Sequence, residues 1–176
     1  MTQFDEDTGE ITLTYRLAGM HTKELIKLTT HQTVYLSGPY GSFTHELAED
    51  NTSPVVYITG GIGITPFVDR IMRESETREQ WLFAANRTKP LAALYEPLRK
   101  RLGSRAVAIY SRDQREMGAN EEVGYITYDM LKKYIADPTK YRYYICGPQM
   151  MINSMTSMLT ANGVHPSTIH SEEFAW

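Results

Sequence analysis

With 176 residues, 41% of them hydrophobic, the chain is long enough to bury a core, and its composition excludes a disordered protein. A formal net charge of -3, with both signs mixed along the chain, offers no electrostatic footprint for nucleic acid. A single cysteine, Cys146, excludes an internal disulfide and a cysteine-ligated cluster, and the five histidines lack metal-ligand spacing, so we expect no metal site.

Residues 1–47 have the pattern of the C-terminal remnant of an antiparallel β-barrel. Apolar and polar residues alternate from Gly9 to Leu17 and predict a strand. Thr22 is expected to cap a short helix, Thr33–Leu36 has the composition of a second strand, and Ser37–Phe43 that of a tight turn. Two strands and a short helix cannot hide an apolar face, which indicates that the beginning of this domain is missing.

After a polar linker at 45–54, residues 48–176 predict an α/β fold with a doubly wound parallel sheet. Buried-type strands alternate with helical stretches, as right-handed crossovers between parallel strands require. The strands are expected at 55–59, 80–85, 106–110, 143–146 and 168–171, and the helices at about 64–76, 90–102, 127–136 and 148–162. Ligands of such sheets bind at the carboxyl ends of the strands.

A glycine-rich turn follows the first of these strands and leads into a helix. Gly60, Gly61 and Gly63 precede Thr65 and Pro66. Glycines let a backbone approach a phosphate closely, and the free N–H groups at a helix start favour negative charge. The spacing is not Gly-x-Gly-x-x-Gly and no Gly-Lys-Ser/Thr follows, which argues against a P-loop hydrolase. We interpret the turn as a pyrophosphate cradle, and the alternative is a turn that binds nothing.

Four stretches together resemble the ferredoxin–NADP reductase superfamily, most closely its branch of ferric reductases and NADPH oxidase dehydrogenase domains. They are Gly38–Phe43, the 60–67 loop, Cys146–Met150 and Ile169–Phe174. The resemblance implies a β-barrel that binds FAD, a following NADP(H)-binding domain, and hydride transfer from nicotinamide to flavin. The family's main flavin-binding strand is not in this chain, so we expect weak or no FAD binding here. The FAD-binding barrel and a membrane heme domain are the partners expected in the complete protein.

The resemblance also implies roles for residues at both ends of the nucleotide. Ser111 and Arg112, with Tyr125 stacked on adenine, mark the 2′-phosphate and favour NADPH over NADH; the alternative is a solvated turn. Cys146 is expected to orient the nicotinamide without attacking it, and Phe174 to cover the flavin ring; the alternatives are a small buried hydrophobe and a simple staple of the last strand. The other expected cofactor contacts are Thr22, Thr65, Pro66, Gly147, Pro148, Met150 and Trp176.

The leading hypothesis is the NADPH-binding portion of a flavin-dependent oxidoreductase that passes hydride to FAD and single electrons to heme, iron or oxygen. The alternatives are a nucleotide-binding module without activity of its own, a fragment of a soluble ferredoxin- or flavodoxin-type reductase, and a scaffold. No apolar run approaches the ~20 residues that cross a bilayer. We therefore expect a cytoplasmic chain, with a missing upstream region leaving open a place at the cytosolic face of a membrane.

Overall fold

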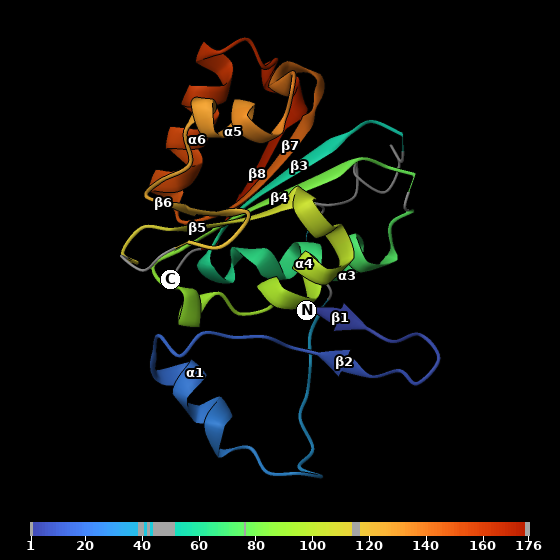
Figure 1. Ribbon diagram of the computed structural model, residues 1–176. Coiled ribbons are helices and arrows are strands. Elements are labelled where there is room, and N and C mark those ends of the chain that lie inside the picture. The colour runs from blue at the N-terminus through green and yellow to red at the C-terminus, as the bar shows by residue number, and fades with distance from the viewer. Residues whose placement is uncertain are drawn as a thin grey trace.

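A six-stranded parallel sheet forms the centre of the molecule (Figure 1). The computed structural model describes residues 2–38, 41, 43, 52–75, 77–113 and 117–174. The strands are β3 (Val55–Gly60), β4 (Gln80–Asn86), β5 (Ala106–Tyr110), β6 (Glu121–Val123), β7 (Arg142–Gly147) and β8 (Ile169–Glu173). Their order in space is β6-β5-β4-β3-β7-β8, and all neighbours are parallel. The strand order reverses between β3 and β7, which confirms the predicted doubly wound sheet.

Helices cover both faces of the sheet (Figure 1). One face carries α3 (Thr65–Arg73) and α4 (Tyr95–Leu102), and the other carries α5 (Tyr128–Tyr134) and α6 (Gln149–Ala161). Along β3, Val55 and Tyr57 join the core under α3 and α4, whereas Val56 and Ile58 join the core under α5 and α6. Because successive side chains point to opposite faces, a strand covered on both sides must be apolar throughout. This is why the central strands were predictable from their continuous apolar runs.

Short 3-10 turns join these elements. They span Leu25–Lys27, Gly61–Ile64, Lys89–Leu91, Gly103–Arg105, Pro138–Lys140 and Pro166–Thr168. The helix expected at 90–102 therefore begins later, at Tyr95, because Leu94 has a left-handed backbone with a φ of 61° that no helix accommodates. The strand β6 was not expected, and in the described residues 111–113 and 117–120 no α-helix connects it to β5.

The described N-terminal residues form a small layer of their own. It contains an antiparallel hairpin of β1 (Gln3–Phe4) and β2 (Ile11–Thr12), followed by α1 (Met20–Glu24). In Figure 1 this layer lies below α3 and α4, on the side away from the sheet. The predicted strand at Gly9–Leu17 is confirmed only at Ile11–Thr12, and the predicted strand at Thr33–Leu36 is wrong. A strand needs a neighbour, and the apolar residues of both segments are exposed, with Tyr35 95% exposed.

The prediction that Thr22 caps the short helix is also wrong. Gly19 occupies the N-cap, and Thr22 lies within the first turn of α1. The Thr22 hydroxyl oxygen accepts hydrogen bonds from the backbone N–H groups of Ala18 and Gly19, each at 3.1 Å. Thr22 thus stabilises the helix start by reaching back to it, which is the reciprocal half of a capping box.

Several predicted features lie outside the described residues. They include most of the linker at 45–54 with the 47/48 boundary, Pro39, Tyr40 and Ser42 of the Gly38–Phe43 motif, and Trp176. The division into 1–47 and 48–176 therefore stays a prediction. In the described part of the chain no helix combines the length and the apolar character that crossing a bilayer requires.

A buried carboxylate joins the end of α3 to the start of β4. Glu74 accepts hydrogen bonds from Arg70 and Arg78, and the Arg78 Nε–H donates to the Ser53 carbonyl oxygen at 2.9 Å. Burial alone would raise the pKa of Glu74, but the hydrogen bond from Arg78, the Ser75 amide and the charge of Arg70 outweigh it and leave the pKa below its ordinary value. Removing one partner of such a buried pair leaves the other charge uncompensated.

We therefore expect Glu74→Gln to lower the free energy of unfolding at pH 7 by about 3 kcal/mol. Since the pKa of Glu74 is lowered on folding, its stabilisation is complete above the unfolded value of 4.5 and disappears as the pH falls through the folded value. Urea denaturation should show the gap between wild type and Glu74→Gln closing below pH 4.5. Glu96→Gln, which breaks an exposed pair with Arg99, is the matched control and should leave the midpoint unchanged. An equal loss in both variants would contradict the assignment.

Candidate functional site

The carboxyl ends of β3 and β7 approach each other where the strand order reverses. Thr59 pairs with Cys146, and the next residues on the two strands are Gly60 and Gly147. A Cβ on Gly147 would lie 3.1 Å from the Gly60 Cα, and a Cβ on Gly63 would lie 2.2 Å from the Cys146 carbonyl oxygen. These three glycines therefore let two backbones touch. The sequence pattern alone did not separate this use in packing from phosphate binding.

Gly61 differs from the other glycines of the turn because it faces open space. Its φ is +56°, and a Cβ there would meet no atom within 4 Å. The turn that it begins is fixed at its far end, where the Thr65 hydroxyl donates to the Ile62 carbonyl oxygen at 3.0 Å. Pro66 then occupies the first turn of α3, where a missing N–H leaves no hydrogen bond unmade. The result is an open backbone turn at a helix start, a shape suited to an anion.

The predicted adenosine-binding residues meet at the carboxyl ends of β5 and β6. The Arg112 N–H donates to the Arg87 carbonyl oxygen at 2.8 Å, and the Gly124 N–H donates to the Tyr110 carbonyl oxygen at 3.0 Å. These bonds place Arg112 and Tyr125 just beyond two neighbouring strand ends. Both side chains are exposed, and Tyr125 is 79% exposed. The structure thus brings a guanidinium and a free aromatic face to one edge.

Ser111 and Arg87 extend the same edge toward β4. The Ser111 N–H donates to the Asn86 carbonyl oxygen at 3.0 Å, so the chain stays paired with β4 one residue past β5. Arg87, the residue after β4, is exposed at this edge.

The predicted nicotinamide end is a buried contact between the last two strands. Cys146 is 0% exposed and belongs to the core under α3 and α4, against which Phe174 also packs. The Phe174 N–H donates to the Gly147 carbonyl oxygen at 3.4 Å. Burial, with a smaller contribution from the charge of Glu172, raises the pKa of the Cys146 thiol to about 12. The thiol is therefore protonated at neutral pH, which is unsuitable for a nucleophile and suitable for a packing group.

The start of α6 completes this end of the edge. Pro148 is the N-cap residue, and its carbonyl oxygen accepts hydrogen bonds from the backbone N–H groups of Met151 and Ile152 at 2.9 and 3.1 Å. Met150 is 86% exposed beside it. Of the other predicted contacts, Thr22 lies in the N-terminal layer on α1, below α3 and α4 in Figure 1, and Trp176 lies outside the described residues.

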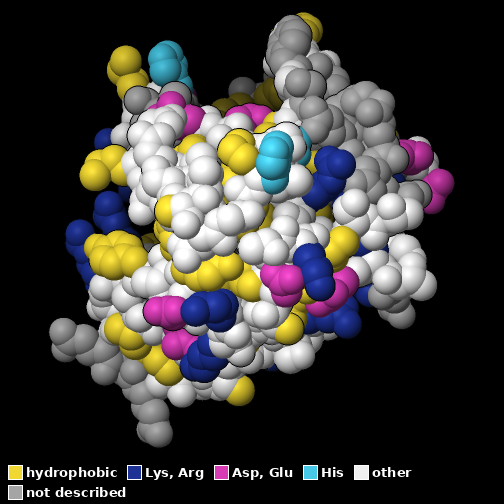
Figure 2. Space-filling model, turned by 90° about the horizontal axis from the view of Figure 1, so that it is seen from above, with side chains coloured by type: hydrophobic (Ala, Val, Ile, Leu, Met, Phe, Trp, Pro, Cys, Tyr) yellow, Lys and Arg dark blue, Asp and Glu magenta, His cyan; other side chains and the backbone are white. Residues whose placement is uncertain are grey.

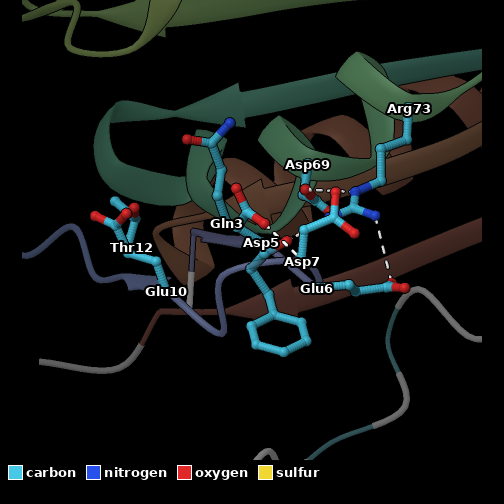
Figure 3. A pocket seen from close by; sticks show the side chains of 9 residues that line it. Gln3, Asp5, Glu6, Asp7, Glu10, Thr12, Asp69 and Arg73 are labelled. Carbon is cyan, nitrogen blue, oxygen red and sulfur yellow. Dashed lines mark hydrogen bonds and ion pairs between the residues drawn. The ribbon is translucent and has the colours of Figure 1, made fainter.

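A cavity elsewhere in the described residues has the wrong charge for a nucleotide. It measures about 520 Å³ and lies between the β1–β2 hairpin and α3. Figure 3 shows the carboxylates of Asp5, Glu6 and Asp69 around it, with Arg73 bonded to Glu6 and Asp69. Such a surface repels phosphate. We therefore place the candidate nucleotide site at the carboxyl edge of the sheet.

Two further observations bear on ligand chemistry. Among the described residues no group of three His, Cys, Asp or Glu side chains is arranged to hold a metal ion. On the face seen in Figure 2, Lys and Arg side chains lie beside Asp and Glu side chains rather than in a patch of one sign. Both observations are compatible with a nucleotide site at the carboxyl edge.

Known proteins are similar to this chain in sequence and in fold. The reductase component of propane 2-monooxygenase from Rhodococcus jostii is 30% identical over 80% of this chain and 40% of that protein. A component of the Na(+)-translocating NADH-quinone reductase from Methylococcus capsulatus is 25% identical over 99% of this chain and 48% of its own length. The flavohemoglobin of Malassezia yamatoensis, solved with FAD and heme, has 26% identity and a TM-score of 0.70 over 93% of this chain and 43% of its own. This chain spans less than half the length of each.

The family model described as the oxidoreductase NAD-binding domain matches residues 57–157. The matched stretch begins in β3 and ends in α6, and it contains the open turn at Gly61, the Ser111–Arg112 edge and the Cys146–Met150 segment. Because this match covers more than half of the chain, and its glycine turn lies at the reversal point of a doubly wound sheet, the chain belongs to the oxidoreductase NAD-binding domain family.

Proposed function

We propose that this chain is the NADPH-binding portion of a flavin-dependent oxidoreductase, which takes hydride from NADPH onto FAD and releases single electrons to heme, iron or oxygen. The observation that carries the proposal is the open turn at Gly61 on the same sheet edge as Arg112 and Tyr125. An anion-binding turn and a cation–aromatic pair on one edge match the two phosphate-bearing parts of a dinucleotide. Within the family, we propose the branch of ferric reductases and NADPH oxidase dehydrogenase domains.

The residues of this edge have separate tasks in the proposal. The backbone of Gly61 binds the pyrophosphate, Ser111 and Arg112 bind the 2′-phosphate, and Tyr125 stacks on the adenine. Thr65, Pro66 and Pro148 border the nicotinamide, and Cys146 orients it from the side of the buried core. When bound, the two cofactors supply the hydride chemistry. The protein contributes position, and the protonated thiol of Cys146 adds an uncharged surface.

The FAD-binding partner follows from the N-terminal layer. Leu13, Leu17 and Ile26 are among its large apolar side chains that are more than half exposed. We propose that residues 1–47 complete a FAD-binding barrel with chain that lies upstream in the whole protein, and that a membrane heme domain is a further partner. Thr22 would contact the FAD pyrophosphate, although its hydroxyl oxygen already accepts two backbone hydrogen bonds. One such contact does not hold a flavin.

The exposed apolar side chains of the N-terminal layer support a second candidate function. If the FAD-binding barrel is incomplete, this chain by itself would bind the nucleotide without catalysing a reaction. A soluble ferredoxin-type reductase is a third candidate, which the similarity to a monooxygenase reductase component favours.

The absorption spectrum of the purified chain and calorimetry with NADP+ separate the first two candidates. A flavin spectrum bleached by NADPH supports the enzyme, and a colourless protein that binds NADP+ supports the nucleotide-binding module. Binding of neither cofactor would refute both.

We expect Arg112→Ala to weaken NADP+ binding by about tenfold or more and to leave NAD+ binding nearly unchanged, because only NADP+ carries the 2′-phosphate that a guanidinium binds. Calorimetric titration of both nucleotides measures this. Arg99→Ala, on the exposed side of α4, is the matched loss of one arginine and should alter neither affinity. Equal weakening of both nucleotides by Arg112→Ala would refute the 2′-phosphate assignment.

Gly61→Ala should weaken NADP+ and NAD+ alike, because its methyl group enters the open space before the turn while a left-handed alanine costs only about 1–2 kcal/mol of stability. Gly63→Ala should instead prevent folding, since its Cβ would lie 2.2 Å from the Cys146 carbonyl oxygen. Calorimetry and thermal unfolding of the two variants distinguish the roles. Unchanged binding of both nucleotides by a folded Gly61→Ala protein would exclude the cradle.

In the flavin-complete protein, Cys146→Ala should slow flavin reduction in stopped-flow measurements by about tenfold while leaving the affinity for NADPH within twofold, because a misplaced reacting group loses rate without losing binding energy. Cys146→Ser, which keeps the size of the side chain, should lose less. A reduction rate equal to that of the wild type in both variants would assign Cys146 to packing alone.

A further inference from the structure

The amino edge of the sheet contains a cavity that the proposed function does not use. Its volume is about 400 Å³, and Ser75, Arg78, Gln80 and the segment Arg101–Arg105 line it. Gln80 begins β4, and Arg105 directly precedes β5. Since β4 has seven residues, this cavity lies about 20 Å from the carboxyl edge. It is therefore separate from the candidate nucleotide site.

The lining carries an uneven charge. Three guanidinium groups, those of Arg78, Arg101 and Arg105, line the cavity, and no carboxylate is among the lining residues. Behind the lining, the Glu74 carboxylate, which is 7% exposed, is bound to Arg78. The lining itself, with three guanidinium groups and no carboxylate, is electropositive. A small concave site with this charge attracts anions.

Two of the guanidinium groups are held rigidly. Arg78 is 1% exposed and donates to the Glu74 carboxylate and the Ser53 carbonyl oxygen, both at 2.9 Å. The Arg101 guanidinium donates to the Glu74 backbone carbonyl oxygen at 2.7 Å. Because these groups are fixed before a ligand arrives, binding costs them little conformational entropy.

The third guanidinium completes the mouth of the cavity. Arg105 is exposed, and no hydrogen bond or ion pair joins it to another described residue. The turn before it is fixed, because the Asn120 amide donates to the Ser104 carbonyl oxygen at 3.2 Å. Gly103, with a φ of +61°, has open space where a Cβ would lie. The Ser104 hydroxyl group lines the cavity beside the arginines, whereas the Ser75 hydroxyl is already bonded to the Thr77 hydroxyl at 2.7 Å.

We propose that this cavity is a second anion site, which binds a small phosphate monoester. Arginine is the side chain best suited to a phosphate because its planar donors match two oxygens at once, and the Ser104 hydroxyl and the Gln80 amide suit a polar organic part. The volume exceeds that of a phosphate ion and lies within the range of small-molecule pockets. The site ties α3, β4 and α4 together, so its ligand stabilises the folded chain.

The test is a titration of the isotope-labelled chain with inorganic phosphate at constant ionic strength, followed by amide NMR shifts. The amides of Ser75 and of Gly103–Arg105 should shift and saturate. In Arg105→Ala the dissociation constant for these shifts should rise by about tenfold or more, and in Arg105→Lys by less, since lysine keeps the charge but not the paired donors. The spectra themselves report that each variant is folded. Arg99→Ala is the matched control and should titrate like wild type.

Phosphate could also occupy the proposed coenzyme edge, and the same spectra separate the two. Shifts confined to Gly61–Ile64 or Ser111–Arg112, or an unchanged dissociation constant in Arg105→Ala, would overturn the second site. Shifts that grow linearly and are reproduced by chloride would overturn it as well, since they indicate screening only. Saturating shifts at Gly103–Arg105 in a chain that fails to bind NADP+ would support this site and refute the proposed function. The two proposals therefore fail independently.

Discussion

The approach of two strand ends at the centre of the sheet is the constraint on which the site depends. Gly147 leaves room for the backbone of Gly60, and Gly63 leaves room for the carbonyl group of Cys146, so β3 and β7 stay in contact up to their last residues. This contact leaves Gly61 as the glycine of the turn that faces open space. Any side chain at Gly63 would collide with the backbone of β7. The close packing at Gly60, Gly63 and Gly147 therefore leaves Gly61 facing open space.

The two edges of the sheet differ in what holds their charges. At the carboxyl edge, backbone hydrogen bonds hold the chain at Arg112 and next to Tyr125, just beyond the strand ends, and the two side chains are exposed. At the amino edge, Arg78 and Arg101 are fixed by Glu74 inside the fold. An exposed cation is reached by a ligand directly from solvent. A fixed cation suits a ligand that remains bound, because little ordering is required.

An element could be predicted where the pattern of its own residues shows how it is buried. The central strands carry their burial in their own sequence, and β5 has the predicted bounds, Ala106–Tyr110. β6 escaped prediction because it has only three residues, of which Glu121 and Glu122 are acidic, and because it is paired by the backbone of β5. The strand expected at Thr33–Leu36 failed for the opposite reason, since its apolar pattern has no neighbour to pair with in the part of the chain that the structure describes. The candidate site was predictable as strand ends, but neither the packing use of Gly63 nor the cavity at Arg105 has a local pattern, because each joins segments far apart in the chain.

The helix α3 has a contact at each of its ends. Its first residue, Thr65, is bonded to the open turn, and its last, Arg73, donates to the Phe4 carbonyl oxygen and to Glu6 in the N-terminal hairpin. Nine helical residues form a rod of about 14 Å, too short to bend appreciably. A displacement of the turn must therefore be absorbed within the turn itself or transmitted along the rod to the hairpin. Mechanically, α3 connects the carboxyl edge of the sheet to the N-terminal layer.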